Sequence, residues 1–472
     1  MRNLRSLSLF LVAGCSSIAV SACSGGVPGG PASTGEGAAT SQGQALTASG
    51  ASVDYRHVKG VRQLTSKPGA PPTDATCRAS SGGPCYSPQE MRTAYGVAPL
   101  IADGYDGTGE TIVIVDSFGS PDIASDLKQF DADYGIPDPP SFQVIAPIGT
   151  VPFDPSSSDQ QGWAFETTLD VEWAHAMAPG ASIVLLTTPV SETEGTVGMP
   201  EMLAVETYAL DHHLGKIISQ SWGATENTLI DDAGKKVVAD FEALYKRARR
   251  EHVTVFASAG DNGPSNQEQD GVTFFPFPTV IYPASSPSVT AVGGTSLTAG
   301  TDGTYQSEVV WDDNGATGGG VSQVFREPSW QALLPASDQR ILAKHRGLPD
   351  VAYNADPATA ILVYLSLPGV PGGYYSIGGT SEGSPQWAGI AAVLNQVAGR
   401  PLGFLNPKLY FLGELGFLAP FTHDITVGNN GINGLAGYAA TPGWDPATGW
   451  GTPALGKLGE LLASLPDDDG QD

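Results

Sequence analysis

The sequence predicts an α/β fold in which a parallel central sheet carries helices on both faces. Short, almost uninterrupted apolar runs alternate with longer stretches of helical character. Such runs are typical of strands buried on both faces of a parallel sheet, and they lie at 111–116, 181–186, 217–219 and 253–257. The expected helices between them span about 164–178, 200–213 and 234–251. We interpret residues 76–465 as the globular domain.

Polar residues stand at the carboxyl ends of these strands, the edge of a parallel sheet where ligands usually bind. They are Asp116, Ser219–Ser221 and Ser258–Asp261. The search for functional residues therefore starts at this edge.

The composition excludes some classes of partner. Acidic residues outnumber basic ones 49 to 23, which gives a formal net charge of −26 and a pI near 4.4. This charge argues against binding to nucleic acid and against binding to anionic membranes through surface charge. It suits a protein that works in acid, where many carboxyls are neutral, and it is explained equally well by solubility alone.

The N-terminus has the layout of a secretory signal over residues 1–23. Arg2 and Arg5 precede an apolar run at 9–12, and small residues follow. Cys15 and Cys23 each stand where a bacterial lipoprotein cysteine would be lipidated, and we favour Cys23 because cleavage at Cys15 leaves a very short apolar core. Simple secretion is the alternative. We expect an extracytoplasmic protein, secreted or lipid-anchored in a bacterial envelope, with no membrane contact beyond that lipid.

Two further segments flank the globular domain. Residues 24–75 are rich in Gly and Ser and are interpreted as a linker, and 466–472 as an acidic tail. Cys77 and Cys85 bracket a flexible loop, and export makes a disulfide between them the expected outcome.

The strongest local signal surrounds Ser381. The segment from Gly378 to Ile390 reads Gly-Gly-Thr-Ser-Glu-Gly-Ser-Pro-Gln-Trp-Ala-Gly-Ile, so glycines allow a tight turn before a helix begins. A serine there lies among free backbone N–H groups that can stabilise an oxyanion. An ordinary helix N-cap is the alternative. The similar Gly-Gly-Thr-Ser at 293–296 is followed by no helix.

A serine nucleophile needs a base, and none of the seven histidines lies in a setting typical of one. Two carboxylates are the other candidates. Glu166 and Asp170 are four residues apart, on one face of an expected helix with unusually apolar flanks. Two solvated surface acids are the simpler interpretation of such a pair.

Taken together, three ordered motifs resemble those of the sedolisins, the serine-carboxyl peptidases. They are Glu166 with Leu169 and Asp170, then Ser-x-Gly-Asp at 258–261, then Gly-Thr-Ser-x-x-x-Pro at 379–385. The resemblance extends from about Cys85 to Pro453. It implies a subtilisin-like fold and an endopeptidase that acts on proteins or peptides. A monomer is the default expectation.

The resemblance also implies roles for four residues. Ser381 would be the nucleophile, Glu166 the general base and Asp170 the residue that orients Glu166 through a hydrogen bond. Asp261 would help to form the oxyanion hole, for which it must be protonated. We therefore expect activity in acid.

One structural Ca²⁺ near the C-terminus is implied in the same way. Its ligands would be the carboxylates of Asp424 and Asp445 and the backbone carbonyls of Ile425, Thr441 and Gly443, a hard oxygen set that calcium prefers. Loops stabilised by Asx turns are the alternative.

One feature departs from most sedolisins, which carry a large folded propeptide. Fewer than about a hundred residues precede the catalytic domain here, so we expect a bacterial branch without one. Two other functions stay open. One is a subtilisin-type triad of Asp116, His175 and Ser381, and the other is an inactive surface-binding module on the same fold.

Overall fold

The computed structural model describes residues 54–55, 58–65 and 70–466. The predicted signal, the lipidation sites Cys15 and Cys23 and nearly all of the acidic tail lie outside this part of the chain. Within it, no helix combines the length and the apolar character needed to cross a membrane.

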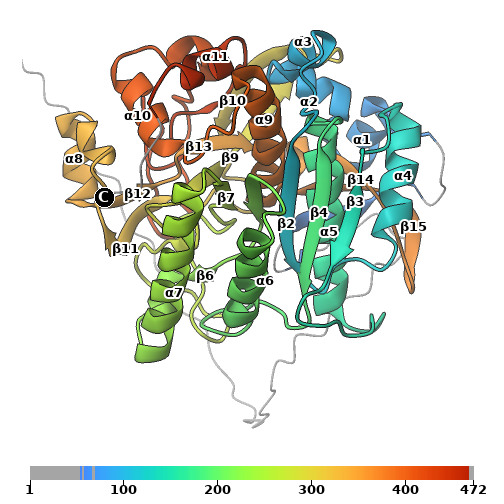
Figure 1. The fold of residues 1–472 in the computed structure, drawn as a ribbon, viewed down its shortest axis with the longest axis horizontal. Coiled ribbons are helices and arrows are strands. Elements are labelled where there is room, and N and C mark those ends of the chain that lie inside the picture. The colour runs from blue at the N-terminus through green and yellow to red at the C-terminus, as the bar shows by residue number, and fades with distance from the viewer. Residues whose placement is uncertain (1–53, 56–57, 66–69, 467–472) are drawn as a thin grey trace, which may run out of the picture. The chain divides into compact units, whose positions relative to one another are not determined.

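A sheet of eight strands forms the centre of the fold (Figure 1). Its order is β10-β9-β7-β5-β2-β4-β3, with β13 paired to β9. All neighbours are parallel except β10 and β9. The strands are β2 (Thr111–Ser117), β3 (Phe142–Ile145), β4 (Ser182–Thr188), β5 (Ile217–Gln220), β7 (Thr254–Ser258), β9 (Thr290–Ala299), β10 (Tyr305–Val310) and β13 (Val351–Asn354). The four predicted runs are the parallel strands β2, β4, β5 and β7.

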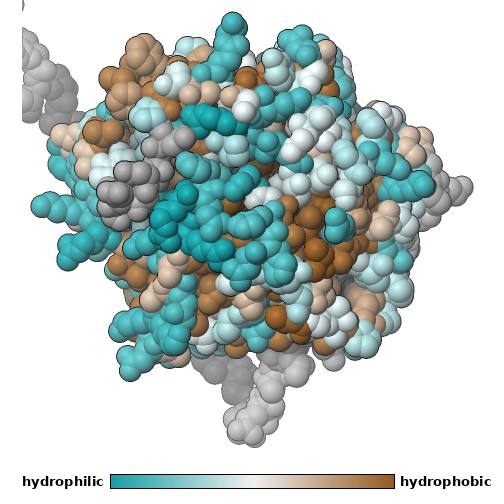
Figure 2. All heavy atoms as spheres, in the orientation of Figure 1, coloured by the Kyte–Doolittle hydropathy of each residue, from teal (hydrophilic) through white to brown (hydrophobic). Residues whose placement is uncertain are grey.

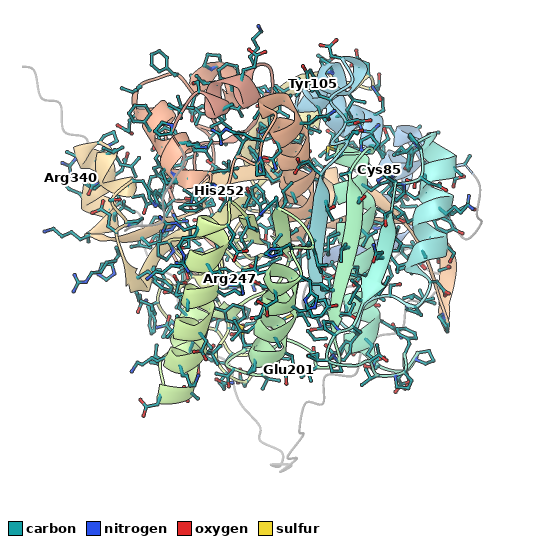
Figure 3. The ribbon with its side chains drawn as sticks, viewed as in Figure 1. Cys85, Tyr105, Glu201, Arg247, His252 and Arg340 are labelled. Carbon is teal, nitrogen blue, oxygen red and sulfur yellow. A yellow bond between two sulfur atoms is a disulfide. The ribbon has the colours of Figure 1, made fainter. Side chains whose placement is uncertain are left out.

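Helices cover both faces of this sheet, as predicted (Figure 1). Alternate residues of β2 show the two faces directly. Ile112 and Ile114 belong to one hydrophobic core, while Val113 and Val115 belong to the other. The first core lies under α5 (Ser158–Met177) and α9 (Gly383–Ala398), and the second under α6 (Met199–Asp211) and α7 (Asp232–Arg250). Hydrophilic residues gather over α7 on the face shown in Figure 2, which includes Arg247, labelled in Figure 3.

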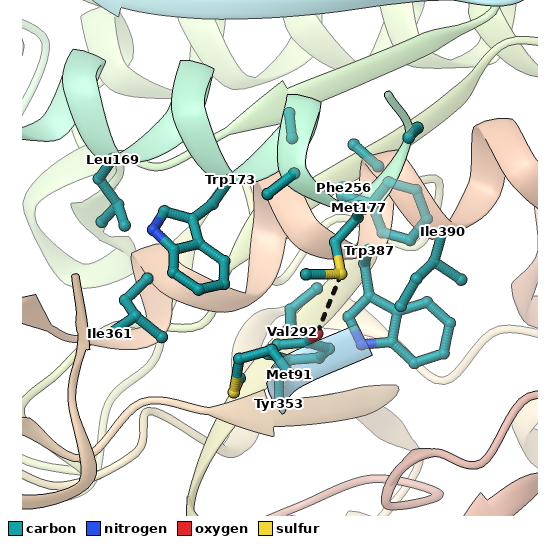
Figure 4. Packing of buried hydrophobic residues seen from close by; sticks show 14 of the residues in the cluster. Met91, Leu169, Trp173, Met177, Phe256, Val292, Tyr353, Ile361, Trp387 and Ile390 are labelled. Atoms are coloured by element: carbon teal, nitrogen blue, oxygen red, sulfur yellow. Dashed lines mark hydrogen bonds between the residues drawn. The ribbon is translucent and has the colours of Figure 1, made fainter. Parts of the chain in front are cut away.

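The first core holds α5 and α9 in fixed positions relative to the sheet. In Figure 4, Met177 of α5 lies between Trp173 of the same helix and Trp387 of α9. The hydroxyl of Tyr353 contacts the Met177 sulfur at 3.6 Å, and the indole of Trp173 donates to Leu362 O at 2.9 Å. The helix that carries Glu166 and Asp170 and the helix that follows Ser381 are therefore both anchored by large, fully buried side chains.

The segment from 54 to 65 corrects the linker prediction. Lys59–Gln63 form strand β1, which pairs antiparallel with β15 (Val370–Gly378), the partner of β14 (Ile361–Leu367). Val58 and Val61 are fully buried, and the Tyr55 ring lies 5.4 Å from that of Phe165. The linker interpretation of this segment is wrong because its few apolar residues are buried against a strand some 300 residues away.

The other elements complete the fold. A disulfide joins Cys77 to Cys85, as predicted, and Cys85 is labelled in Figure 3. Cys77 lies in α1, which begins just before the predicted domain boundary. The remaining helices are α1 (Asp74–Ser81), α2 (Pro88–Ala94), α3 (Val97–Ala102), α4 (Ile123–Tyr134), α8 (Ala336–Leu342), α10 (Asn406–Glu414) and α11 (Leu458–Ala463). The remaining short strands are β6 (Ala224–Thr225), β8 (Ile281–Tyr282), β11 (Gly320–Arg326), β12 (His345–Leu348), β16 (Thr422–His423) and β17 (Thr452–Pro453).

Candidate active site

Ser381 lies in a short turn between β15 and α9. A 3-10 turn, η4 (Thr380–Glu382), follows Gly379 and leads directly into α9. Gly379 has a φ of 115°, and a Cβ atom at this position would lie 2.7 Å from Asp261 Oδ2. Only glycine meets both constraints. The turn thus places Ser381 at the N-terminus of a helix, as predicted, with 3% of its surface exposed.

Glu166 and Asp170 project from α5 toward this turn. Both are fully buried, because residues 162–177 of α5 are buried on every side. The Ser381 hydroxyl interacts with the Glu166 carboxyl. Neither oxygen of Glu166 makes a hydrogen bond of standard length and angle within the described residues, so this contact is loose. Hydrogen bonds at a catalytic base are often long before substrate binds.

Asp170 is hydrogen-bonded differently from the sequence-based expectation. Its Oδ1 accepts a hydrogen bond from Ser221 Oγ at 2.8 Å, and its Oδ2 makes none within the described residues. The expected hydrogen bond between Asp170 and Glu166 is therefore not formed. Ser221 follows β5, so the carboxyl edge of the sheet supplies the group that holds Asp170 in place.

Asp261 reaches the nucleophile turn from the loop after β7. Its Oδ1 accepts hydrogen bonds from Thr380 N at 2.7 Å and from Thr380 Oγ1 at 2.9 Å. The hydroxyl of Thr380 also accepts a hydrogen bond from Gly260 N at 3.0 Å. These bonds fix the Asp261 carboxyl beside the residue that precedes Ser381.

A fourth carboxyl, that of Asp116, completes the cluster. Asp116 stands at the carboxyl end of β2 and is fully buried. Its charge acts on both Glu166 and Asp170. The sequence predicts Asp116 at this edge and as a member of the alternative triad with His175, but not among the four residues that the resemblance implies.

Burial dominates the electrostatics of this cluster. It raises the pKa of Glu166 and of Asp170 well above the usual range, and the neighbouring acidic side chains raise both further. Burial raises the pKa of Asp116 to about 7. It also raises the pKa of Asp261, while the charge of Lys59 acts in the opposite direction. The group holds protons at pH values where exposed carboxyls have lost them.

His175 takes no part in this cluster. Its Nε2 lies 3.3 Å from Asp131 Oδ2 and 2.9 Å from Pro137 O. The ring is fully buried and is committed to α4 and the loop after it. The alternative triad of Asp116, His175 and Ser381 is therefore not assembled.

A cavity of about 60 Å³ opens beside Ser381. Two acidic residues, Glu194 and Asp261, line it together with Trp222 and Ile281. The described residues that line it include no Lys, Arg or His. Its position next to Ser381 suits a side chain of an extended peptide.

The predicted calcium ligands lie close together. Asp424 Oδ2 accepts a hydrogen bond from Gly443 N at 3.0 Å, and Asp445 Oδ2 accepts one from Thr441 N at 3.0 Å. Both carboxylates therefore contact the backbone of the 441–443 loop. The carbonyls of Thr441 and Gly443 in this loop are among the predicted Ca²⁺ ligands. Burial raises the pKa of Asp445 to about 7. Within the described residues no three His, Cys, Asp or Glu side chains gather as a metal site, so backbone carbonyls would have to supply most ligands.

Comparison with known proteins identifies relatives of this chain. A family model described as the subtilase family matches residues 160–407. Kumamolisin of Bacillus sp. (strain MN-32) is 39% identical over 82% of the chain and 65% of its own length. Sedolisin of Pseudomonas sp. (strain 101) is 31% identical over 80% of the chain and 61% of its own length. The chain thus spans less than two thirds of each of these relatives.

The fold agrees with these matches. A solved structure of Pseudomonas sedolisin, a serine-carboxyl proteinase complexed with two molecules of pseudo-iodotyrostatin, superposes with a TM-score of 0.68. It is 30% identical, and the match covers 81% of this chain and 99% of that one. The predicted subtilisin-like fold is confirmed.

Proposed function

The chain belongs to the subtilase family and to its sedolisin branch, and from this premise we propose that it is an exported serine-carboxyl endopeptidase that hydrolyses peptide bonds of proteins in acid. One observation carries the proposal. Ser381, Glu166, Asp170 and Asp261, which come from α5, the end of β7 and the start of α9, converge on one buried site beside a cavity. An inactive binding module has no use for four such groups in one place.

Ser381 attacks the peptide carbonyl in the proposed reaction. Glu166 takes the hydroxyl proton as the Oγ–C bond forms, and it returns this proton to the amine as the C–N bond breaks. Water then attacks the acyl-enzyme by the same route and releases the acid. Asp170, held by Ser221, keeps a second acid next to Glu166, and its charge raises the pKa of Glu166.

The oxyanion is stabilised by Asp261 and by free N–H groups at the start of α9. A carboxyl donates a hydrogen bond only while it is protonated. Burial raises the pKa of Asp261, which supports a protonated side chain in acid. Glu166 must be ionised while Asp261 is protonated when Ser381 attacks, so the shared protons of the cluster must lie on Asp261 rather than on Glu166 at that step.

Calcium and export complete the proposal. Asp424, Asp445 and the carbonyls of Ile425, Thr441 and Gly443 would hold one Ca²⁺, whose charge would balance the two carboxylates and stabilise their loop. The Cys77–Cys85 disulfide supports an extracytoplasmic location, because disulfides persist in oxidising compartments. The signal and the lipid on Cys23 remain predictions from sequence.

The test is hydrolysis of an unfolded protein by the purified full chain from about pH 3 to about pH 8. Ser381→Ala is the key variant, and Ser296→Ala, in the similar Gly-Gly-Thr-Ser segment of β9, is its matched control. We expect activity in acid that only Ser381→Ala abolishes. A peak at neutral pH, or activity that survives in Ser381→Ala, contradicts the proposal.

A further inference from the structure

Glu382, the residue after the proposed nucleophile, has a buried carboxyl that the mechanism above does not use. It ends the η4 turn and is fully buried. Placing an acid in such a position is costly unless its polar atoms are used. Its contacts show what it does there.

The Glu382 side chain joins the nucleophile turn to the central sheet. Its Oε2 accepts a hydrogen bond from Asn354 Nδ2 at 3.0 Å, at the end of β13. Its backbone oxygen accepts a hydrogen bond from Gln386 Nε2, one turn along α9, at 3.0 Å. One residue thus connects Ser381 both to the helix that follows and to a strand beneath it.

Asn354 is itself held on every polar atom of its side chain. Nδ2 also donates to Thr359 O at 2.8 Å, while Oδ1 accepts from Leu297 N at 3.0 Å and from Thr359 Oγ1 at 2.8 Å. Leu297 lies in β9, so the amide is fixed between two neighbouring strands. The partner of Glu382 therefore has no freedom to follow a displaced turn.

This attachment continues deeper into the protein. Asn354 N donates to the Tyr95 hydroxyl at 3.1 Å, and that hydroxyl donates to Glu308 Oε1 at 2.6 Å. Glu308 also accepts hydrogen bonds from Thr295 and Thr452. The nucleophile turn is therefore attached to a buried polar network that spans β9, β10, β13 and β17.

The surroundings of Glu382 favour an uncharged carboxyl. The titratable groups that act on it, from β13, the loop after β13 and the loop after β7, are Tyr353, Asp356 and Asp261, and none of them is a cation. Hydrogen bonds from Asn354 and from the backbone of Ile361 act in the opposite direction and lower its pKa. Burial is the largest cause that raises its pKa, well above the usual range. A protonated Glu382 can accept from Asn354 with one oxygen and carry its proton on the other, with no charge left unbalanced.

We propose that Glu382 is a positioning residue, whose hydrogen bond to Asn354 clamps the nucleophile turn to β13 and so fixes Ser381 for attack. The inference rests on the proposed function, since it assumes that Ser381 is the nucleophile. A mere packing role predicts that loss of the carboxyl costs stability alone. A clamp predicts a selective loss of reactivity at Ser381, because displacement of a reacting atom by about 1 Å can cost on the order of 100-fold in rate.

The test compares Glu382→Ala and Glu382→Gln in the full chain. Glutamine keeps the size, the acceptor for Asn354 and the lack of charge, so it should rescue the clamp. The matched control is Glu172, a fully buried carboxyl of α5 that accepts one backbone hydrogen bond from Tyr364 N at 3.0 Å and leaves its other oxygen without one in the described part of the chain. If Glu382→Ala does not fold, Glu382→Met, which fills the space without hydrogen bonding, replaces it.

Three measurements separate the roles: kcat, KM, and the affinity for a peptide aldehyde relative to the same peptide amide. The aldehyde carbon bonds to Ser381 Oγ, and its oxygen receives the hydroxyl proton, so only the aldehyde reports on the position of the nucleophile. We expect Glu382→Ala to lower kcat on the order of 100-fold and to weaken the aldehyde selectively, with KM and amide binding unchanged. Glu382→Gln and Glu172→Ala should keep kcat within about threefold of the parent.

Either of two results overturns the inference: a kcat for Glu382→Ala equal to that of Glu172→Ala, or a Glu382→Gln as impaired as Glu382→Ala. Failure of the proposed function looks different, because Ser381→Ala would then retain activity and the aldehyde would gain nothing over the amide in the parent protein.

Discussion

The carboxyl of Asp350 and the carboxyls of the candidate active site are all buried, but the first is surrounded by a cation and hydrogen-bond donors and the others by further acids. Asp350, after β12, is 2.6 Å from Arg346 Nη2. It also accepts hydrogen bonds from Ala291 N at 2.8 Å, Asn406 Nδ2 at 3.0 Å and Tyr410 OH at 2.9 Å. At the active site, Glu166 lies among Asp116, Asp170 and Asp261 with no standard hydrogen bond in the described residues.

The difference separates structure from chemistry. A buried carboxylate with a guanidinium and three hydrogen-bond donors has all its polar interactions made. Removing any of these partners is therefore expected to lower the stability of the fold. A buried carboxyl among other acids shares protons with its neighbours, because not all of them can be ionised at once. Such a group can take up and release a proton during a reaction, as a general base must. Burial alone therefore does not mark a functional acid. Like charges and few hydrogen bonds do so only where a group such as Ser381 lies beside the carboxyl, since Glu172 is buried near Asp126 and Asp131 with one hydrogen bond in the described residues.

The largest expected effect comes from changing a carboxyl of the candidate active site. Glu166→Gln removes the base but keeps the shape, and we expect kcat to fall by about 10² to 10⁴-fold. Its thermal stability should not fall, because the exchange removes one of several buried acids. Steady-state kinetics and calorimetry on the same preparation check both statements. A variant that unfolds more easily but keeps its kcat would assign Glu166 to the structural group.

The reciprocal change acts on the satisfied carboxyl. Arg346→Met leaves Asp350 buried without its cation, and we expect a loss of about 3–5 kcal/mol in the free energy of unfolding. The kcat of the molecules that remain folded should be unchanged. Denaturant unfolding measures the stability, and titration of the active site with a covalent inhibitor gives the concentration of folded enzyme on which kcat is based. A loss below about 1 kcal/mol would show that the three hydrogen bonds suffice without the guanidinium.

The pH dependence of stability sharpens the comparison further. Burial raises the pKa of Asp116 to about 7 and that of Glu206, in α6, to about 8. Because these folded-state values lie above the unfolded values near 4, the folded protein binds more protons between the two. Stabilisation is therefore complete below about pH 4 and is lost as the pH rises toward 8.

Melting temperatures from about pH 4 to about pH 8 test this expectation, and they should fall across the range. Glu206→Gln cannot ionise, so its melting temperature should fall less steeply. A melting temperature that rises with pH would mean that the buried acids are compensated by nearby cations, as Asp350 is by Arg346.

The smallest expected effect concerns Asp424 and Asp445. Their carboxyls accept backbone hydrogen bonds, as Asp350 does, but neither is paired with a cation side chain in the described residues. If the loop binds calcium, an excess of about 100 times the dissociation constant should stabilise the fold by about 2.7 kcal/mol. Chelation should reverse this, and Asp445→Asn should abolish the response, while Asp302→Asn, in an exposed loop, keeps it. Identical melting curves with calcium and with chelator would favour Asx turns alone.

Much of the fold could be predicted because it depends on local pattern. The strands β2, β4, β5 and β7 are continuous apolar runs, and α6 and α7 begin and end within two residues of their expected bounds, whereas α5 begins six residues before its expected start. Strand β1 could not be predicted in this way. Lys59, Gly60 and Arg62 interrupt its apolar residues, and its partner lies in β15, about 300 residues later.

The site was predictable to a different extent. The four residues that the motifs marked do come together, but the membership of Asp116 and the binding of Asp170 to Ser221 rather than to Glu166 appear only when the sheet closes. The role we infer for Glu382 depends on Asn354, which no sequence pattern connects to it. Side-chain partners set by three-dimensional closure are the part that sequence reasoning could not supply.

Strand β1 also determines how the protein should be produced. Its residues Lys59, Arg62 and Gln63 pair with Gly378, Ser376 and Tyr375 of β15. A chain that began at residue 76 would turn β15 into an edge strand with unpaired backbone groups and would uncover the apolar surface that Val58 and Val61 now fill. Exposed edges of this kind recruit other chains, so the truncated protein is expected to self-associate and precipitate. Solubility of the catalytic domain therefore depends on a segment that its composition alone would assign to a tether.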